Sequence, residues 1–259
     1  GLLQGAAAAA LTGVGVAPRP AAAAAAKVLV LGGDGFVGSR VCAALAAQGC
    51  AVVAASRTLD AALPAGVAFA PLDLTAPGAA DEVARLSAGC VAVVSCVGAI
   101  GTPLDLQVNG ATGLVAVAAK KAGVSKFVYV SVAPDVHAAL GSVGALQPYF
   151  EGKASSEAAI SAAFGADATF LRPTFIYGGD AFNVNPPRVA SAYGAFVEAA
   201  LSTPLLRFAA GVSPGLISVA LEPPVSVDAV AAAAAAAALG KGAGGFDDHD
   251  AIVALAAML

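Results

Sequence analysis

Residues 27–38 read KVLVLGGDGFVG, a short apolar run that ends in three glycines spaced three residues apart. A continuous run of valine and leucine predicts a strand buried on both faces, and the residues after it predict a helix. Gly32, Gly35 and Gly38 form the turn between the two, where a Cβ would keep a pyrophosphate away from the backbone N–H groups. Such N–H groups at the start of a helix bind an anion. The motif therefore predicts a dinucleotide-binding turn.

The chain beyond this turn alternates strand and helix patterns as far as residue 178. Further apolar runs predict strands at residues 51–55, 67–70, 91–95, 126–131 and 168–171. Helical patterns lie between them at residues 36–47, 81–87, 109–122 and 148–164. At this spacing, right-handed crossovers build one parallel sheet with helices on both faces. The predicted fold class is α/β, a doubly wound parallel Rossmann sheet with a small C-terminal substrate lobe.

Three segments follow from this pattern. Residues 1–26 contain one arginine and no acid, which resembles the tail of an organelle transit peptide and predicts a leader or linker. The alternative is a flexible alanine-rich terminus that carries no targeting signal. Residues 27–179 are expected to form the NAD(P)-binding core. Residues 180–259 are expected to form the substrate or cap lobe, in which proline pairs and irregular spacing interrupt the alternation until helices return near the C-terminal end.

The composition excludes several classes of protein. Hydrophobic residues make up 59% of the chain, yet no window of about 18 strongly apolar residues predicts a transmembrane helix. The net charge is −4 and Lys and Arg are thinly spread, which argues against nucleic acid as a partner. We interpret the alanine tract at 229–238 as compositional bias that places small residues where they are tolerated.

The sequence predicts neither a metal site nor reactive cysteines. The four cysteines form no Cys-x-x-Cys pair and have no histidine at zinc spacing, which predicts buried reduced thiols and no metal site. These cysteines are Cys42, Cys50, Cys90 and Cys96. His137 and His249 have no partner at the spacing of a catalytic triad or a metal site, so both are expected to be solvated loop residues.

The end of the second predicted strand indicates which nucleotide the turn holds. An NAD site places Asp or Glu there to bind the ribose hydroxyls. This chain has Ala54-Ala55-Ser56-Arg57, with no acid between these residues and Asp60. The Arg57 guanidinium and the Ser56 hydroxyl suit a 2′-phosphate, so NADP(H) is predicted in preference to NAD(H).

The third predicted strand leads to Asp73-Leu74. This position is suited to contact the adenine of the nucleotide. The alternative for Asp73 is an ordinary helix cap, because Asp is a preferred residue before the first turn of a helix.

Six motifs resemble, in order and spacing, those of the extended and atypical short-chain dehydrogenase/reductases, over about residues 27–239. They are GGDGFVG at 32–38, VSCVG at 94–98, VNG at 108–110, KFVYVS at 126–131, YFEGK at 149–153 and LRPTFIYG at 171–178. The chain is similar to a plant, algal and fungal group of organellar NAD(P)-binding proteins, which EPPVSVD at 222–228 supports. That group includes plastoglobule or thylakoid proteins and a mitochondrial protein linked to ubiquinone synthesis. It lies near the NADPH-binding accessory subunit of respiratory complex I.

The resemblance implies a catalytic pair in Tyr149 and Lys153, which are one helical turn apart on one face. The tyrosine is the general acid/base at the substrate oxygen, and the lysine holds the nicotinamide ribose and lowers the pKa of the tyrosine by its charge. A third catalytic Ser or Thr is expected just after the fifth strand. Ser131 is the hydroxyl there, but Val132 is the other match to that position. Ser131 is therefore either a substrate-orienting hydroxyl or a strand-end serine.

The resemblance also extends the predicted cofactor site. Ser95-Cys96-Val97-Gly98 replaces the Asn-Ala-Gly of the superfamily and would wrap the cofactor through backbone groups. The residues expected to contact the nucleotide are Gly32, Gly35, Phe36, Val37, Gly38, Ser56, Arg57, Asp73, Leu74, Cys96, Val97, Gly98 and Lys153. Asn109 is expected to anchor its helix, and Tyr177 to be structural. Arg172 either meets phosphate or substrate or pairs with a carboxylate.

Two functions are consistent with these residues. Residues 181–221 are poor in charge, which suits an apolar substrate or a hydrophobic partner surface. One function is an NADPH-dependent reductase that transfers hydride to a carbonyl or quinone-like apolar substrate while Tyr149 delivers the proton. The other is a non-catalytic NADP(H)-binding structural or redox-sensing subunit of an organellar membrane-associated complex. The leader and the resemblance favour a chloroplast location, at the thylakoid or plastoglobule, over the mitochondrion.

Overall fold

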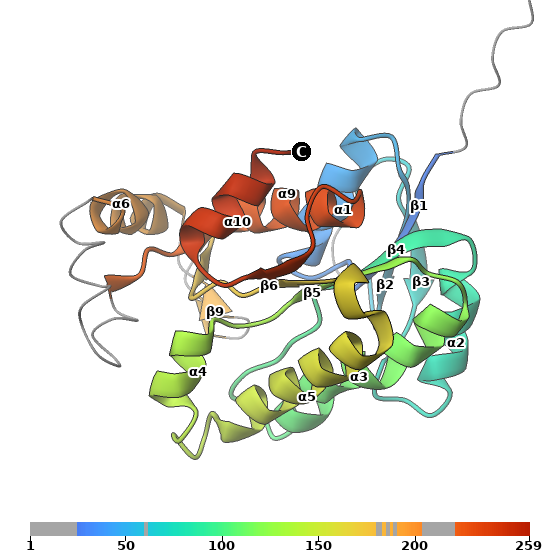
Figure 1. Ribbon diagram of the computed structural model, residues 1–259, viewed down its shortest axis with the longest axis horizontal. Coiled ribbons are helices and arrows are strands. Elements are labelled where there is room, and N and C mark those ends of the chain that lie inside the picture. The colour runs from blue at the N-terminus through green and yellow to red at the C-terminus, as the bar shows by residue number, and fades with distance from the viewer. Residues whose placement is uncertain (1–24, 60–61, 180–182, 185–186, 189–190, 204–220) are drawn as a thin grey trace, which may run out of the picture.

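The computed structural model describes residues 25–59, 62–179, 183–184, 187–188, 191–203 and 221–259 (Figure 1). The expected leader therefore lies almost wholly outside the described residues, as do residues 180–182, 185–186, 189–190 and 204–220 of the expected substrate lobe.

A seven-stranded parallel sheet forms the centre of the protein, in the order β11-β6-β5-β4-β1-β2-β3. Its strands are β1 (Lys27–Leu31), β2 (Ala51–Ser56), β3 (Ala68–Pro71), β4 (Cys90–Ser95), β5 (Lys126–Val130), β6 (Ala168–Leu171) and β11 (Gly244–Phe246). The order reverses between β1 and β4, which is the switch point of a doubly wound sheet. The predicted α/β fold is confirmed.

Helices cover both faces of the sheet (Figure 1). One face carries α1 (Gly38–Ala47), α9 (Val227–Ala238) and α10 (His249–Ala256), and the other carries α2 (Ala79–Ser87), α3 (Asp105–Lys121) and α5 (Gln147–Phe164). Side chains alternate along each strand. Val28 and Val30 therefore join the core under α1 and α9, while Leu29 and Leu31 join the core under α2, α3 and α5.

Smaller elements lie beyond the carboxyl ends of the strands. They are α4 (Pro134–Leu140), β7 (Ile176–Tyr177) paired with β10 (Val225–Ser226), the hairpin β8 (Asn183–Val184) and β9 (Pro187–Arg188), and α6 (Ser191–Leu201). At the amino end of β6, η1 (Gly165–Asp167) joins α5 to this strand. Neither α4 nor the two short sheets were predicted. Within the described residues, no helix combines the length and the apolar character that a membrane crossing requires.

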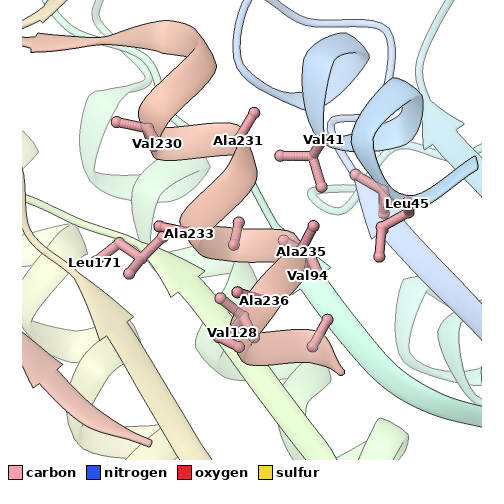
Figure 2. Packing of buried hydrophobic residues seen from close by; sticks show 14 of the residues in the cluster. Val41, Leu45, Val94, Val128, Leu171, Val230, Ala231, Ala233, Ala235 and Ala236 are labelled. Carbon is pink, nitrogen blue, oxygen red and sulfur yellow. The ribbon is translucent and has the colours of Figure 1, made fainter. Parts of the chain in front are cut away.

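The alanine tract has a structural role that the sequence interpretation missed. Ala233 to Ala238 are at most 2% exposed and lie in α9, which packs on the sheet beside α1. Figure 2 shows the alanines of α9 beside Val94 and Val128 of the strands and near Val41 of α1. Small side chains let the helix lie close to both neighbours, so interpretation as tolerated bias is wrong for this tract.

The C-terminal region returns to the core more fully than expected. The predicted helices there correspond to α9 and α10, but β11 also pairs with β6 and extends the central sheet. Residues 227–259 thus belong to the layers of the nucleotide-binding fold. Of the described residues after 179, the part outside these layers is the short hairpin, α6, β10 and the residues just before β10.

Candidate functional site

The glycine turn after β1 has the geometry that the motif predicts. Gly32 has a φ of +75° and donates its N–H to the carbonyl oxygen of Ala55 at 2.7 Å. A Cβ on Gly38 would lie 2.0 Å from the carbonyl oxygen of Gly32, and one on Gly33 would lie 2.7 Å from the Cβ of Ala54. The turn therefore requires glycine at 38, where α1 begins, and it lies directly against β2.

A cleft of about 360 Å³ opens at the carboxyl ends of β1 to β4, beside this turn. It brings together predicted nucleotide contacts from four separate strand ends: Gly32, Gly35, Ser56, Arg57, Asp73, Leu74, Cys96, Val97 and Gly98. Sequence reasoning missed other residues that line it, namely Asp34, Ala55, Thr58, Leu72, Thr75, Leu104, Val108 and Ala111. The last three follow the spacing of one helix face, a signal that was present in the sequence.

The predicted phosphate-binding residues occupy one cleft but differ in their contacts. The Ser56 hydroxyl accepts the backbone N–H of Asp34 at 3.0 Å, so it joins the end of β2 to the glycine turn. Arg57, the next residue, is exposed and lines the cleft.

Asp73 forms a tight turn after β3. One of its carboxylate oxygens accepts the backbone N–H of Thr75 at 2.9 Å and the Thr75 hydroxyl at 2.7 Å. These bonds, with a smaller contribution from the charge of Arg57, hold the pKa of Asp73 below its ordinary value. The next helix, α2, has Gly78 at its N-cap position. The alternative of a helix cap for Asp73 is therefore wrong, and the residue lines the cleft.

A second pocket, of about 290 Å³, shares Cys96 and Gly98 with the cleft. Its wall is almost wholly apolar and contains the three predicted catalytic residues, Ser131, Tyr149 and Lys153. The remaining lining residues are Phe36, Val37, Ala99, Ile100, Val130, Val132, Val136, Leu140, Leu146, Phe150, Pro173, Thr174, Phe175 and Ile176. Phe36 and Val37, predicted to contact the nucleotide, thus lie at this second pocket.

Lys153 is deeply buried, at 5% exposure. Its ammonium donates to the carbonyl oxygens of Val97 at 3.1 Å and Val130 at 2.9 Å, and lies 4.7 Å from the centre of the Tyr129 ring. Burial lowers the pKa of Lys153 to about 8 because it penalises the charged form. The ammonium thus holds the strand ends of β4 and β5 together beneath the shared wall.

Tyr149 differs from what the resemblance implies. Burial raises the pKa of its phenol above the ordinary value, and the negative charge of Asp105 raises it further. The charge of Lys153 does not offset this increase, and its ammonium donates to the carbonyl oxygens of Val97 and Val130. The phenol therefore stays protonated as a donor.

Ser131 follows β5 directly and is 6% exposed. Its backbone N–H donates to the carbonyl oxygen of Leu171 at 2.8 Å, but its buried hydroxyl has no hydrogen-bond partner within the described part of the chain. A buried hydroxyl without a partner is energetically costly, and Ser131 lines the second pocket. Val132, the other match to the catalytic position, also lines this pocket.

The loop between β4 and α3 separates the two cavities and is firmly held. Asn109, fully buried, donates to the carbonyl oxygen of Ala99 at 2.7 Å. The buried carboxylate of Asp105 accepts the N–H groups of Gly101 at 2.7 Å and Thr102 at 3.0 Å. Asn109 therefore anchors the loop to its helix, as expected, while the matching role of Asp105 was missed.

Arg172 and Tyr177 lie outside both cavities. Arg172 pairs with Glu157 at 2.6 Å and Asp247 at 2.5 Å, so it joins α5, the end of β6 and the segment after β11. Of the two roles considered for Arg172, the structure shows the carboxylate pairing. Tyr177 donates its hydroxyl to Glu198 of α6, a structural contact as expected.

The prediction of a solvated loop residue is wrong for His249, whereas His137 is exposed as predicted but lies in a helix. His249 is 8% exposed at the start of α10, with Nε2 2.7 Å from Glu198 and Nδ1 2.9 Å from Asp250. His137 lies in α4, where its ring stacks on Phe150 with the centres 4.9 Å apart. Glu198, one partner of His249, is 51 residues away in sequence, and the helix that holds His137 was not predicted.

The cysteines are free thiols, as predicted. Cys42 and Cys90 are buried, and burial raises the pKa of Cys42 to about 12. Among the described residues, no group of three or more His, Cys, Asp or Glu side chains could hold a metal ion.

A doubly wound sheet with a glycine turn and a cleft at its switch point defines a dinucleotide-binding α/β protein. The chain belongs to the NAD(P)H-binding family, which it matches over residues 32–194.

Individual relatives agree with this assignment. An uncharacterized chloroplastic protein of Arabidopsis thaliana is 36% identical over 159 residues, which are 59% of this chain and 51% of that protein. The match thus spans about half the length of the curated relative.

Solved structures with this fold bind nicotinamide nucleotides. WbmH of Bordetella bronchiseptica in complex with NAD+ has a TM-score of 0.59 at 19% identity, over 85% of this chain and 74% of that one. MoeE5 in complex with UDP-glucose and NAD has a TM-score of 0.55 at 21% identity, over 89% of this chain and 81% of that one. At these identities the likeness concerns the fold.

Proposed function

We propose that the protein is an NADP(H)-dependent oxidoreductase of the atypical short-chain dehydrogenase/reductase type that reduces a carbonyl or quinone-like group on an apolar substrate. One observation carries the proposal. Ser131, whose hydroxyl has no partner among the described residues, and Tyr149 line one apolar pocket, and this pocket shares Cys96 and Gly98 with the nucleotide cleft.

The residues present fit a dinucleotide. The glycine turn lines the cleft and leads into α1, where a Cβ at position 38 would strike the carbonyl oxygen of Gly32, and the start of a helix is a place where anions bind. Arg57 supplies a cation for the 2′-phosphate, and Leu72 and Leu74 supply an apolar wall. When bound, NADPH supplies a hydride.

The chain's own residues would orient the substrate and supply a proton. The Ser131 hydroxyl would donate to the carbonyl oxygen of the substrate and so fix its position. The protonated phenol of Tyr149 would deliver a proton to the same oxygen as negative charge develops there. Lys153 would bind the nicotinamide ribose while holding the carbonyls of Val97 and Val130. Apolar side chains around these groups would exclude water and accept the rest of the substrate.

We also propose a plastid location, at the thylakoid or plastoglobule, with membership of the organellar group that includes the ubiquinone-linked proteins and lies near the complex I subunit. The 36% identity with a chloroplastic protein supports the plastid. Expression of the full-length precursor as a fluorescent fusion in plant or algal cells, followed by plastid fractionation, tests this location. Signal confined to mitochondria would contradict it.

A second function is favoured by two specific observations. Val132 occupies one match to the third catalytic position, and the pKa of Tyr149 is raised rather than lowered. Both suit a subunit that binds NADP(H) within a membrane-associated complex without turnover.

An activity test separates the two functions. Purified protein is examined for bound nucleotide, and NADPH oxidation is followed with a panel of quinones and apolar aldehydes. The reductase proposal expects turnover that Tyr149→Phe abolishes while nucleotide affinity is retained. Tyr177→Phe is the matched control, because Tyr177 lies outside both cavities and should leave turnover intact. Absence of turnover with every acceptor, together with a nucleotide that does not exchange, would support the non-catalytic subunit.

The choice of nucleotide has a separate test. Arg57→Ala should weaken NADPH binding about tenfold and leave NADH binding nearly unchanged, because only the 2′-phosphate loses a charged partner. Dissociation constants from nucleotide fluorescence measure both. Equal losses for the two nucleotides would contradict the phosphate role of Arg57.

A further inference from the structure

The structure places Asp34 next to the end of β2, a strand end that carries no acidic residue of its own. The end of β2 carries Ser56 and Arg57, without the Asp or Glu that binds ribose hydroxyls in NAD sites. Asp34, 22 residues earlier, contacts this same position, because its backbone N–H donates to the Ser56 hydroxyl at 3.0 Å. Asp34, Ser56 and Arg57 all line the nucleotide cleft.

The other acid that lines the cleft, Asp73, lies at a different strand end. Asp73 lies at the end of β3, and one of its carboxylate oxygens is bound by both the N–H and the hydroxyl of Thr75. Asp34 instead belongs to the glycine turn, between the site of the pyrophosphate and the end of β2. An adenosine ribose bound in the cleft would bridge these two places, which would bring its 2′ group near Asp34 and Arg57.

We infer that Asp34 is a specificity-determining residue that limits the preference for NADPH and allows the cleft to bind NADH as well. The Asp34 carboxylate accepts a hydrogen bond from the 2′-hydroxyl of NADH and repels the 2′-phosphate of NADPH. Arg57 acts in the opposite sense, because its guanidinium attracts the phosphate. This inference rests on the proposed 2′-phosphate site at Arg57, and it predicts that the two side chains set the balance between the nucleotides.

Dissociation constants of NADPH and NADH for full-length wild type and Asp34→Asn test the inference. Asparagine keeps the shape of the side chain and removes its charge. The NADPH constant should fall and the NADH constant should rise, so that the ratio of NADH to NADPH constants increases about tenfold. Asp34→Ser should shift the ratio in the same direction. This second variant replaces Asp34→Asn in the test if the asparagine amide group disturbs the glycine turn. Asp81→Asn, an exposed change of equal charge in α2 outside the cleft, should leave the ratio unchanged.

Two results would overturn the inference. One is an unchanged ratio in both Asp34 variants while circular dichroism shows them folded. The other is an equal loss of affinity for the two nucleotides, which would mean that Asp34 only shapes the turn. Arg57→Ala distinguishes this failure from that of the proposed phosphate site. If Arg57→Ala affects both nucleotides equally while Asp34→Asn still shifts the ratio, the phosphate role fails and the role of Asp34 survives.

Discussion

At the scale of single residues, two glycines differ in how a substitution by alanine should change the stability of the protein. A Cβ on Gly38 would lie 2.0 Å from the carbonyl oxygen of Gly32, whereas one on Gly110, inside α3, would meet nothing within 4 Å. Gly38→Ala should therefore lower the free energy of unfolding by about 2–4 kcal/mol and weaken nucleotide binding, since the backbone of the turn must move.

Gly110→Ala is the matched control. It should raise the free energy of unfolding by about 0.5–1 kcal/mol, because alanine loses less backbone entropy inside a helix. Urea unfolding and nucleotide titration measure both variants. Equal behaviour of the two variants would contradict the tight geometry of the turn.

Lys153 gives the protein a stability that depends on pH. Burial lowers its pKa from the ordinary value of 10.5 to about 8, so the folded protein releases this proton at a lower pH than the unfolded chain does. Between these two values the unfolded chain binds more protons, and the folded state becomes more stable as the pH rises. The penalty for burying the charge is largest below pH 8 and absent above pH 10.5.

Comparison with Lys153→Met isolates this contribution from other titrating groups. The free energy of unfolding of the wild type, minus that of the variant, should increase by about 2 kcal/mol from pH 7.5 to pH 9.5. Chemical denaturation at several pH values, without nucleotide, measures the difference. A difference that stays constant with pH would show that the ammonium is not penalised by burial.

At the scale of elements, α9 depends on the small size of its side chains. Ala235 is fully buried in the core that includes Val94 and Val41 (Figure 2). Ala235→Leu should lower the free energy of unfolding by about 1–3 kcal/mol, because the added carbons force the helix away from the sheet or from α1. Ala158→Leu, on the exposed face of α5, should change it by less than about 0.5 kcal/mol. Thermal and urea unfolding compare the two, and equal losses would contradict the close approach of α9.

Elements with a local side-chain pattern were the ones that the sequence could predict. The six apolar strand runs correspond to β1 to β6, with ends that differ by a residue. β11 was missed, because Gly244 and Gly245 provide no alternating side chains and the strand exists through its pairing with β6. The burial of the alanine tract was missed for a related reason, since alanine is compatible with both a surface and a tightly packed core.

In the candidate site, too, only the residues that belong to a local sequence pattern could be predicted. Residues of the glycine turn and the strand ends could be placed in the cleft, because parallel strands bring their carboxyl ends to one edge. Asp34 beside Ser56, and His249 beside Glu198, depend on contacts between residues 22 and 51 positions apart. No local pattern encodes such pairs. The roles of Ser131, Tyr149 and Lys153 remain proposals that the activity test addresses.

At the scale of the whole molecule, ligand binding should stabilise the complete domain. The cleft joins four strand ends and the loop before α3, so a bound nucleotide is lost when any of them unfolds. NADPH at about 100 times its dissociation constant adds about 2.7 kcal/mol, which should raise the melting temperature by roughly 5–10 °C. Scanning calorimetry measures the shift. Nicotinamide mononucleotide, which lacks the adenosine half, should produce a much smaller one, and equal shifts would argue against the adenosine cleft.

The position of α9 in the chain also has a consequence for biosynthesis. Val41 and Leu45 of α1 share a core with α9, yet roughly 180 residues separate the two helices along the polypeptide. Ribosomes would need on the order of ten to forty seconds to make that stretch. During this time the nascent chain carries the apolar face of α1 without its cover, so chaperones that bind exposed valine and leucine have a defined window in which to act.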